Sequence, residues 1–249
     1  LQLYAGLQKS FEQLAVFCAD QGDCPLGDDP TAATAEVQDL LQPLVDEPIV
    51  SSTGREVSFY NAVEGIVLGL YDDAVWPAVI AGLTELREGR ADTLLALRDL
   101  YAGRSEEGTY SSGSDAGFVI NCIDERPMTA AETTAVLAET RAAAPFMDPG
   151  ADVQSEYGCA GWPDDATLDF PYATDIQGLP QTLVVSTTGD GLTPHEGGVA
   201  LAEALDAGLL TVDGEKHGMV TSGDPCVSGI VSDYLVNLDV PEDGARCEP

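Results

Sequence analysis

Hydrophobic residues recur at helical spacing through the first 117 positions of the chain. In residues 1–19 the apolar side chains share one side of a predicted helix: Leu3, Leu7, Phe11, Leu14 and Phe17. The same spacing predicts four further helices: 34–45, 58–71, 76–87 and 92–102. No alternation of apolar and polar residues marks a half-buried strand here, and 48–56 and 104–117 are predicted to be loops. We therefore expect residues 1–117 to form an all-helical domain.

The pattern changes in residues 118–249, where short apolar runs predict strands at 118–123, 182–186 and 209–212. Helices are predicted at 129–144, 198–205 and 225–238. Thr129 and Glu132 form a capping-box pattern at the start of the first of these helices. Gly208 is expected to end the second. Strands alternating with helices indicate an α/β domain with a parallel sheet.

Two residues suited to acid–base chemistry follow the last two predicted strands. Asp190 lies in the loop after 182–186, and His217 comes directly after 209–212. In open parallel sheets, ligands bind outside the carboxyl ends of the strands, so the two side chains are expected to meet there. A neutral imidazole can take a proton from a hydroxyl, and a carboxylate can fix its tautomer and stabilise the imidazolium. The spacing therefore predicts a catalytic pair.

The sequence around this pair resembles a known family over four stretches: GDGLTPHEGG, VDGEKHG, DPCVSGIVSDYL and VPEDGARC. They are similar to the C-terminal region of secreted actinobacterial α/β-hydrolases of the tripeptidyl aminopeptidase type. The resemblance implies an α/β fold in which residues 1–117 form a helical cap (lid) and 118–249 the C-terminal part of the hydrolase core. Two loop residues depart from the family pattern, Gly191 where Pro is usual and Lys216 where Gly is common.

A nucleophile is not evident. The chain has no Gly-x-Ser-x-Gly, and three serines lack the strand–elbow–helix setting that a nucleophile needs: Ser112, Ser186 and Ser222. Because the family order is Ser, Asp, His, we expect the nucleophile upstream of Leu1, in an N-terminal segment of the same protein. This chain alone is then expected to be inactive.

The resemblance implies a secreted or cell-surface serine peptidase that removes short N-terminal peptides through an acyl-enzyme, with no cofactor. An esterase acting on small acyl esters uses the same machinery and stays an alternative. A third interpretation is a non-catalytic acidic binding or cap module.

Three further residues are candidates for substrate binding. Asp124 and Glu125 follow the predicted strand 118–123 and are candidates to hold the ammonium group of a peptide, although solvated surface charges are the plainer interpretation. Thr193 lies in the Asp190 loop, where its hydroxyl can contact substrate, hold the carboxylate or shape the turn. His195 is predicted to occupy the surface or the rim of a pocket.

Charge narrows the range of partners. The chain has 10 Lys and Arg residues against 43 Asp and Glu, a formal net charge of −33. Such a surface repels phosphate backbones, which argues against nucleic-acid binding. No run of about 18 apolar residues predicts a membrane span. The Asp-x-Asp-x-Asp-Gly pattern of a calcium loop does not occur.

Six cysteines fit a disulfide set formed in an oxidising compartment, and six allow 15 pairings. Cys18 and Cys24 flank a short turn and can close a small loop. A zinc site is not expected, because no Cys-x-x-Cys occurs and the two His are not at ligand spacing. The family resemblance implies three pairs: Cys18–Cys24, Cys122–Cys159 and Cys226–Cys247.

Overall fold

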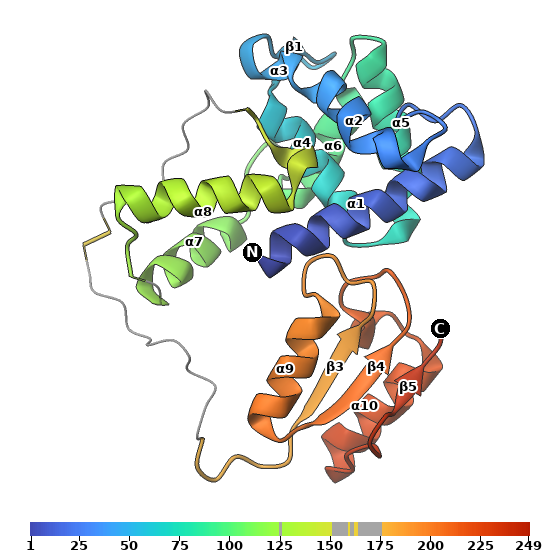
Figure 1. Ribbon diagram of the computed structural model, residues 1–249, viewed down its shortest axis with the longest axis vertical. Helices are drawn as coiled ribbons and strands as arrows, with labels where there is room; N and C mark the ends of the chain where they lie inside the picture. The colour runs from blue at the N-terminus through green and yellow to red at the C-terminus, as the bar shows by residue number, and fades with distance from the viewer. Residues whose placement is uncertain (125, 151–158, 160–161, 164–175) are drawn as a thin grey trace.

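The computed structural model describes residues 1–124, 126–150, 159, 162–163 and 176–249. Helices gather in one part of the molecule and a small sheet with its flanking helices forms the other (Figure 1). The carboxyl ends of β3 and β4 point toward the helical part, and α1 crosses above them (Figure 1). The junction between the two parts is therefore where residues that follow β3 and β4 must lie.

The helical part runs from α1 to η3. Its elements, in order, are α1 (Gln2–Gln21), η1 (Pro30–Ala32), α2 (Ala33–Leu41), α3 (Pro43–Asp46), β1 (Ile49–Val50), β2 (Glu56–Val57), α4 (Phe59–Gly69), η2 (Asp73–Val75), α5 (Trp76–Arg87), α6 (Asp92–Tyr101), α7 (Gly113–Asp124), α8 (Ala130–Ala143) and η3 (Pro145–Met147). The predicted capping box is present, since the Thr129 hydroxyl accepts from the Glu132 N–H and the Glu132 carboxylate accepts from the Thr129 N–H.

A continuous apolar core fills the helical part. Phe11 of α1 stacks on Phe146 of η3 with ring centroids 4.7 Å apart. The Gln8 side chain also receives the Phe146 N–H, at 3.2 Å. Since both contacts join α1 to a segment well beyond residue 117, η3 packs as part of the helical core.

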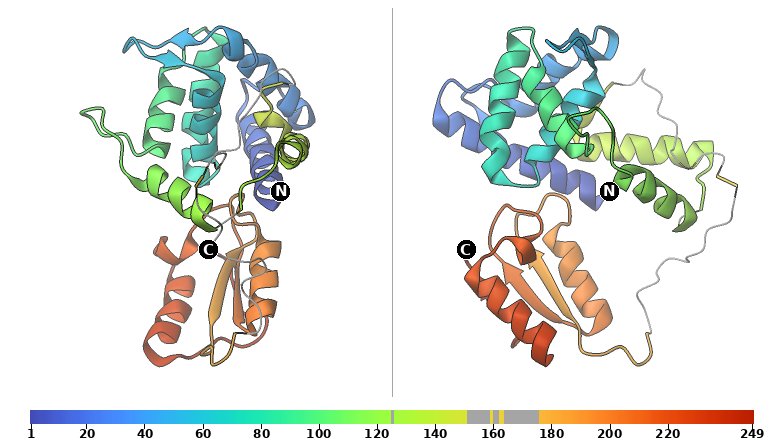
Figure 2. Two further views of the ribbon diagram at one scale, coloured as in Figure 1. Left: turned by 90° about the vertical axis from the view of Figure 1, so that its left-hand side faces the viewer. Right: turned by 180° about the vertical axis from the view of Figure 1, so that it is seen from behind.

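The α/β part contains β3 (Leu183–Thr187), α9 (His195–Leu205), β4 (Gly208–Val212), η4 (Met219–Thr221), α10 (Pro225–Asn237) and β5 (Arg246–Cys247). β3, β4 and β5 form a parallel sheet in that order, with Leu183 opposite Gly208 and Thr187 opposite Val212. Helices α9 and α10 cover opposite faces of this sheet (Figure 2). Its buried core is small: Leu210, Val212, Met219, Val227 and Cys247.

The structure contains three disulfides, with the same pairs that the family resemblance implied: Cys18–Cys24, Cys122–Cys159 and Cys226–Cys247. Of the described residues, none belongs to a helix with the length and hydropathy needed to cross a bilayer.

Several predictions about local structure are wrong. Residues 118–123 lie within helix α7 and do not form a strand, because a short apolar run fits a helix as well as a strand when judged by periodicity alone. The predicted loop at 48–56 holds most of the two-stranded ribbon of β1 and β2, and the tail contains β5. Helix α9 ends at Asp206, in the left-handed conformation at φ 51°, so Gly208 instead begins β4.

The predicted domain boundary between residues 117 and 118 falls inside α7. Helices continue to Met147 of η3, past that boundary. The composition of the chain changes at residue 118, but the type of secondary structure changes only after η3.

Candidate active site

Asp190 follows β3 in a tight loop and is buried, with 7% of its surface exposed. Its Oδ1 accepts the N–H groups of Leu192 and Thr193, both at 2.9 Å, and its Oδ2 accepts the Thr193 hydroxyl at 2.7 Å. These donors fix the orientation of the carboxylate. Thr193 thus lies where the sequence analysis allowed, with its hydroxyl on the carboxylate.

The Asp190 loop packs closely on α1. A Cβ placed on Gly191 would lie 2.7 Å from the Ser10 Cβ, and one on Gly6 would lie 2.5 Å from the Gly191 carbonyl oxygen. Any side chain at either glycine would push α1 away from the loop. The Gly191 that departs from the family pattern is therefore matched in this chain by a close backbone contact with the helical part.

His217 follows β4, and the structure brings it to Asp190. The imidazole Nδ1 lies 2.9 Å from Asp190 Oδ2 and 3.2 Å from Oδ1, and 3.3 Å from the Thr193 hydroxyl. The side chain of His217 is 35% exposed, whereas that of Asp190 is 5% exposed. A half-buried imidazole with Nδ1 on a buried carboxylate has Nε2 available to a hydroxyl.

The helical part supplies the other contacts of His217. Its backbone N–H donates to the Tyr71 carbonyl at 2.9 Å, and the Tyr71 ring meets the imidazole edge-on, with centroids 5.5 Å apart. Burial, then the neighbouring Tyr101 and the Asp190 charge, raise the pKa of Tyr71. The sequence analysis missed Tyr71, because no local pattern connects a residue after helix α4 with one after strand β4.

The neighbours of His217 in the chain are also held at the junction. Lys216 forms an ion pair of 2.5 Å with Asp72, the residue after Tyr71. The carboxylate of Glu215 lies under Gly189, where a Cβ would overlap it. Burial raises the pKa of Glu215 above its ordinary value, against smaller opposing effects of Gln13 and Lys9.

The remaining predicted site residues do not join this cluster. Asp124 is half-buried at the end of α7, on a helix and not behind a strand. Glu125 lies outside the described residues. His195 is the first residue of α9, and its Nδ1 contacts the Ser186 hydroxyl at 3.0 Å. It also lines a cleft of about 270 Å³ between α1 and the Asp190 loop, so it occupies the rim of a pocket.

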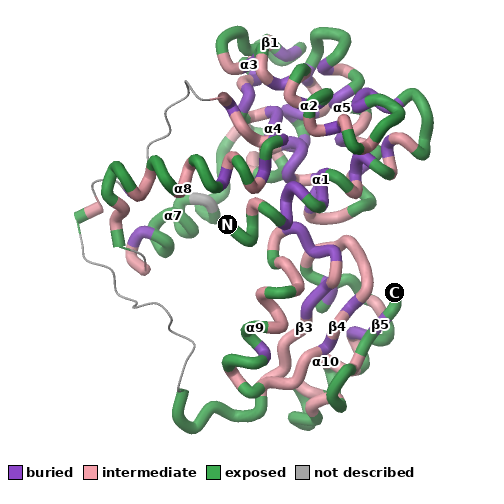
Figure 3. The backbone as a smooth tube through the Cα atoms, viewed as in Figure 1, coloured by how far each residue is buried: buried purple, intermediate pink, exposed green. Residues whose placement is uncertain are grey.

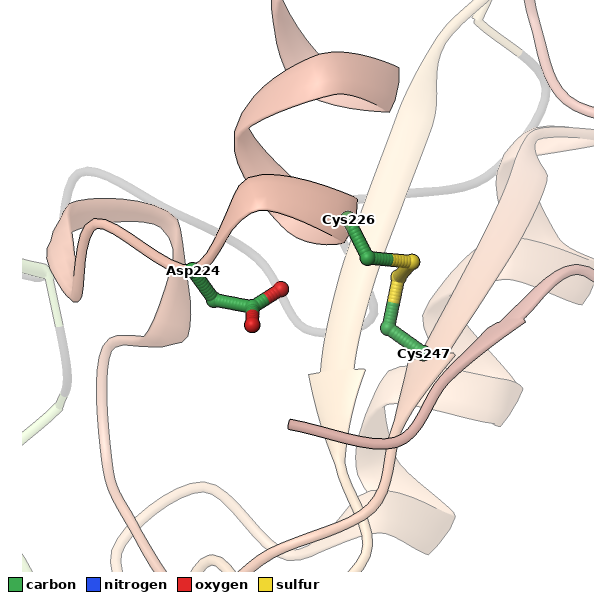
Figure 4. A group of neighbouring side chains, drawn as sticks. All are labelled: Asp224, Cys226 and Cys247. Carbon is green, nitrogen blue, oxygen red and sulfur yellow. A yellow bond between two sulfur atoms is a disulfide. The ribbon is translucent and has the colours of Figure 1, made fainter.

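One group of side chains has the composition of a metal site. Asp224, Cys226 and Cys247 lie together beside the first turn of α10 (Figure 4). The two sulfurs are joined in a disulfide, and the Asp224 carboxylate caps α10 by accepting the Val227 N–H at 2.9 Å. Since a disulfide has no thiolate to bind a metal, this group stabilises the fold.

Comparison with known proteins extends these findings. Residues 144–247 match the family model described as TAP-like protein. The chain is 39% identical to serine protease Hip1 of Mycobacterium tuberculosis, over 97% of the chain and 48% of that protein. It is 36% identical to carboxylesterase B of M. tuberculosis, over 98% of the chain and 48% of that protein. Tripeptidyl aminopeptidase of Streptomyces coelicolor is 30% identical over 42% of the chain and 19% of that protein.

The chain thus spans about half the length of the first two of these relatives. The matched region contains both β3 and β4 and both residues of the Asp190–His217 pair. The fold, with its helical region set against parallel strands, is that of the same class. This chain, through its C-terminal region, belongs to the TAP-like family of α/β-hydrolases.

Proposed function

We propose that Asp190 and His217 are the acid and the base of a Ser–His–Asp triad. The observation that carries the proposal is the 2.9 Å contact between His217 Nδ1 and Asp190 Oδ2 at the carboxyl ends of adjacent parallel strands. In that arrangement the carboxylate holds the imidazole with Nδ1 protonated, so that Nε2 is the basic nitrogen. Three donors on Asp190 keep the carboxylate from turning away.

The serine of this triad is proposed to lie on a polypeptide segment outside residues 1–249. Among the residues that the structure describes, no serine hydroxyl lies within hydrogen-bonding distance of His217. Two relatives are about twice as long as this chain. Within the described residues, β3 pairs with β4 on one side only, which leaves an edge that a further strand can extend.

The proposed reaction proceeds in two stages. His217 Nε2 takes the serine proton as the serine oxygen attacks the acyl carbon, and then gives this proton to the departing amine. Water next attacks the acyl-enzyme with His217 again as the base, which releases the acid and restores the serine. Asp190 stabilises the imidazolium in both stages.

For the substrate, we propose peptides from which short N-terminal units are removed. Relatives named as a serine protease and a tripeptidyl aminopeptidase support this class. The net charge of −33 favours the approach of a substrate that carries an ammonium group. Hydrolysis of small acyl esters is the second candidate, supported by the relative named carboxylesterase B. Three disulfides support a location outside the cytoplasm.

A fluorophosphonate probe, which labels activated serines, tests the proposal. The whole polypeptide is expected to be labelled on a serine outside residues 1–249, and His217→Ala is expected to abolish the label. Residues 1–249 alone should not be labelled. A label inside residues 1–249, or one that survives His217→Ala, overturns the triad, and no label on the whole polypeptide favours the non-catalytic binding module.

Substrate class is tested on the same material. A tripeptide p-nitroanilide with a free N-terminus is expected to be cleaved faster than its N-acetylated form. Faster turnover of p-nitrophenyl butyrate than of both peptides supports the esterase.

A further inference from the structure

We propose that the loop between α4 and η2, in the helical part, is a positioning element for the catalytic base. Tyr71 and Asp72 of this loop hold His217 and Lys216, and they thereby set where the imidazole lies above the strand ends. The inference takes from the proposed function only that His217 is the base. It gives the helical part a role in the chemistry besides covering the site.

The first contact is through the main chain. The His217 N–H donates to the Tyr71 carbonyl at 2.9 Å, so its hydrogen-bond partner comes from the helical part and not from the sheet. Tyr71 is in turn tied to α4, because its own N–H donates to Leu68 at 3.2 Å. The edge-on ring contact with the imidazole at an interplanar angle of 88° restricts rotation of the side chain.

The second contact is the ion pair between Lys216 and Asp72. Asp72 Oδ2 lies 2.5 Å from Lys216 Nζ, and its Oδ1 accepts the Ala74 N–H at 3.1 Å as the cap of η2. Partial burial acts to raise the pKa of Asp72, but the ion pair and the Ala74 bond outweigh it and the pKa is lowered. Lys216 is one of the two departures from the family pattern, so this pair is a feature of the present chain.

The loop that carries His217 needs such support. It has glycines with positive φ at both ends, Gly214 at 155° and Gly218 at 77°, which makes the intervening backbone easy to deform. Catalysis by a positioned base is sensitive to displacements of about 1 Å. Two contacts from the rigid helical core restrain this loop where the small sheet core does not reach.

The same contacts also balance charge near the base. Asp190, Thr193 and Tyr71 face the imidazole directly, and Tyr101 stands behind Tyr71. Glu215, Asp73 and the Lys216–Asp72 pair are the other charged groups of the two loops. Because the pair is neutral as a whole, loss of either partner leaves one net charge beside His217.

Nuclear magnetic resonance titration of the two histidines of the chain tests the inference. A unit charge about 8 Å away in water moves a titration midpoint by roughly 0.4 pH unit. Asp72→Asn leaves the Lys216 charge and is expected to lower the midpoint of the His217 imidazole. Lys216→Met leaves the Asp72 charge and is expected to raise it. His195→Gln assigns the signals, and Glu88→Gln, which removes a carboxylate from an exposed ion pair elsewhere in the cap, is the matched control.

The double variant Asp72→Asn with Lys216→Met separates position from charge. Its midpoint is expected to return to that of the wild type. The His217 amide is nevertheless expected to exchange with solvent at least tenfold faster, because the Tyr71 bond opens more often. Equal shifts in both single variants, or unchanged exchange in the double variant, overturn the positioning role.

Activity and labelling keep this inference separate from the proposed function. In the whole polypeptide, the double variant is expected to lower kcat about tenfold with little change in KM, and still to react with the fluorophosphonate, more slowly. If the wild type does not react while the titration and exchange results hold, the triad fails and the contact between the two parts stands. If the wild type reacts and the double variant matches it in kcat, the positioning role fails alone.

Discussion

The helical part and the α/β part differ in how each is stabilised. Buried apolar residues run through the helical part from α1 to η3, whereas in the α/β part they form a small cluster around β4 (Figure 3). Since hydrophobic burial is the main stabilising contribution in folding, most of it lies in the part that lacks the Asp190–His217 pair.

This difference shows what holds the pair in place. Asp190 and His217 come from the weakly cored sheet, but Gly6, Ser10, Tyr71 and Asp72 of the strongly cored helices contact their loops. The site geometry therefore depends on docking of the two parts. Four substitutions test this division, from the largest expected effect to the smallest.

Asp190→Asn separates chemistry from stability. The amide cannot stabilise the imidazolium or hold the same tautomer, so kcat of the whole polypeptide is expected to fall by roughly 10⁴-fold. The melting temperature should change little. Asp206→Asn, at the left-handed C-cap of α9, is the matched control and should keep full activity. A fall of less than tenfold for Asp190→Asn would remove this carboxylate from the chemistry.

Phe11→Ala probes the core of the helical part. It removes a fully buried ring that stacks on Phe146, and the loss is expected to lower the free energy of unfolding by about 3–5 kcal/mol. Urea denaturation followed by circular dichroism measures it. Phe118→Ala, at a ring that is 46% exposed on α7, should cost much less. Similar losses for both would argue against a separate, strongly cored helical part.

Removal of the Cys226–Cys247 disulfide probes the α/β part. The 21-residue separation predicts a loss of about 3 kcal/mol when both cysteines become Ser. Because the sheet core is small, hydrogen exchange should rise in β4 and β5 and leave α4 and α6 protected. The matched change at Cys18 and Cys24, six residues apart, predicts about 2 kcal/mol and no effect on the sheet. Uniform faster exchange in both variants would show that the two parts unfold as one.

Glu215→Gln probes the junction itself. Burial raises the pKa of Glu215, so its stabilising contribution is complete below its ordinary value and is lost as pH rises through the raised value. Gln resembles the protonated form, and the variant is expected to be more stable than the wild type at pH 7.5, by less than about 1 kcal/mol after solvent screening. Urea denaturation at pH 4 should show no difference. Exposed Glu203→Gln is the control, and a gain for Glu215→Gln that is equal at both pH values would contradict the prediction.

Most elements were predictable from sequence because their patterns are local. Helix α5 has the predicted bounds, and α1, α6, α8 and α10 differ from theirs by two residues or fewer at each end. Strands β3 and β4 also fall where apolar, β-branched runs indicated. α7 was mistaken for a strand because an apolar run of that length does not distinguish the two.

The candidate site was predictable only in part. Asp190 and His217 could be found because each follows a recognisable strand, and parallel strands bring their carboxyl ends to one edge. The expectation for Asp124 depended on a strand that is a helix. Tyr71 and Asp72 had no local signal.

By itself, the sequence determined the helices, the parallel strands and the acid–base pair that follows them, because periodicity, capping residues and strand order act over short distances along the chain. Only the tertiary structure decided that the helical part reaches down to His217 through Tyr71 and to Lys216 through Asp72. These contacts join residues more than 140 positions apart. They arise from how two cores dock, and no short stretch of sequence encodes that.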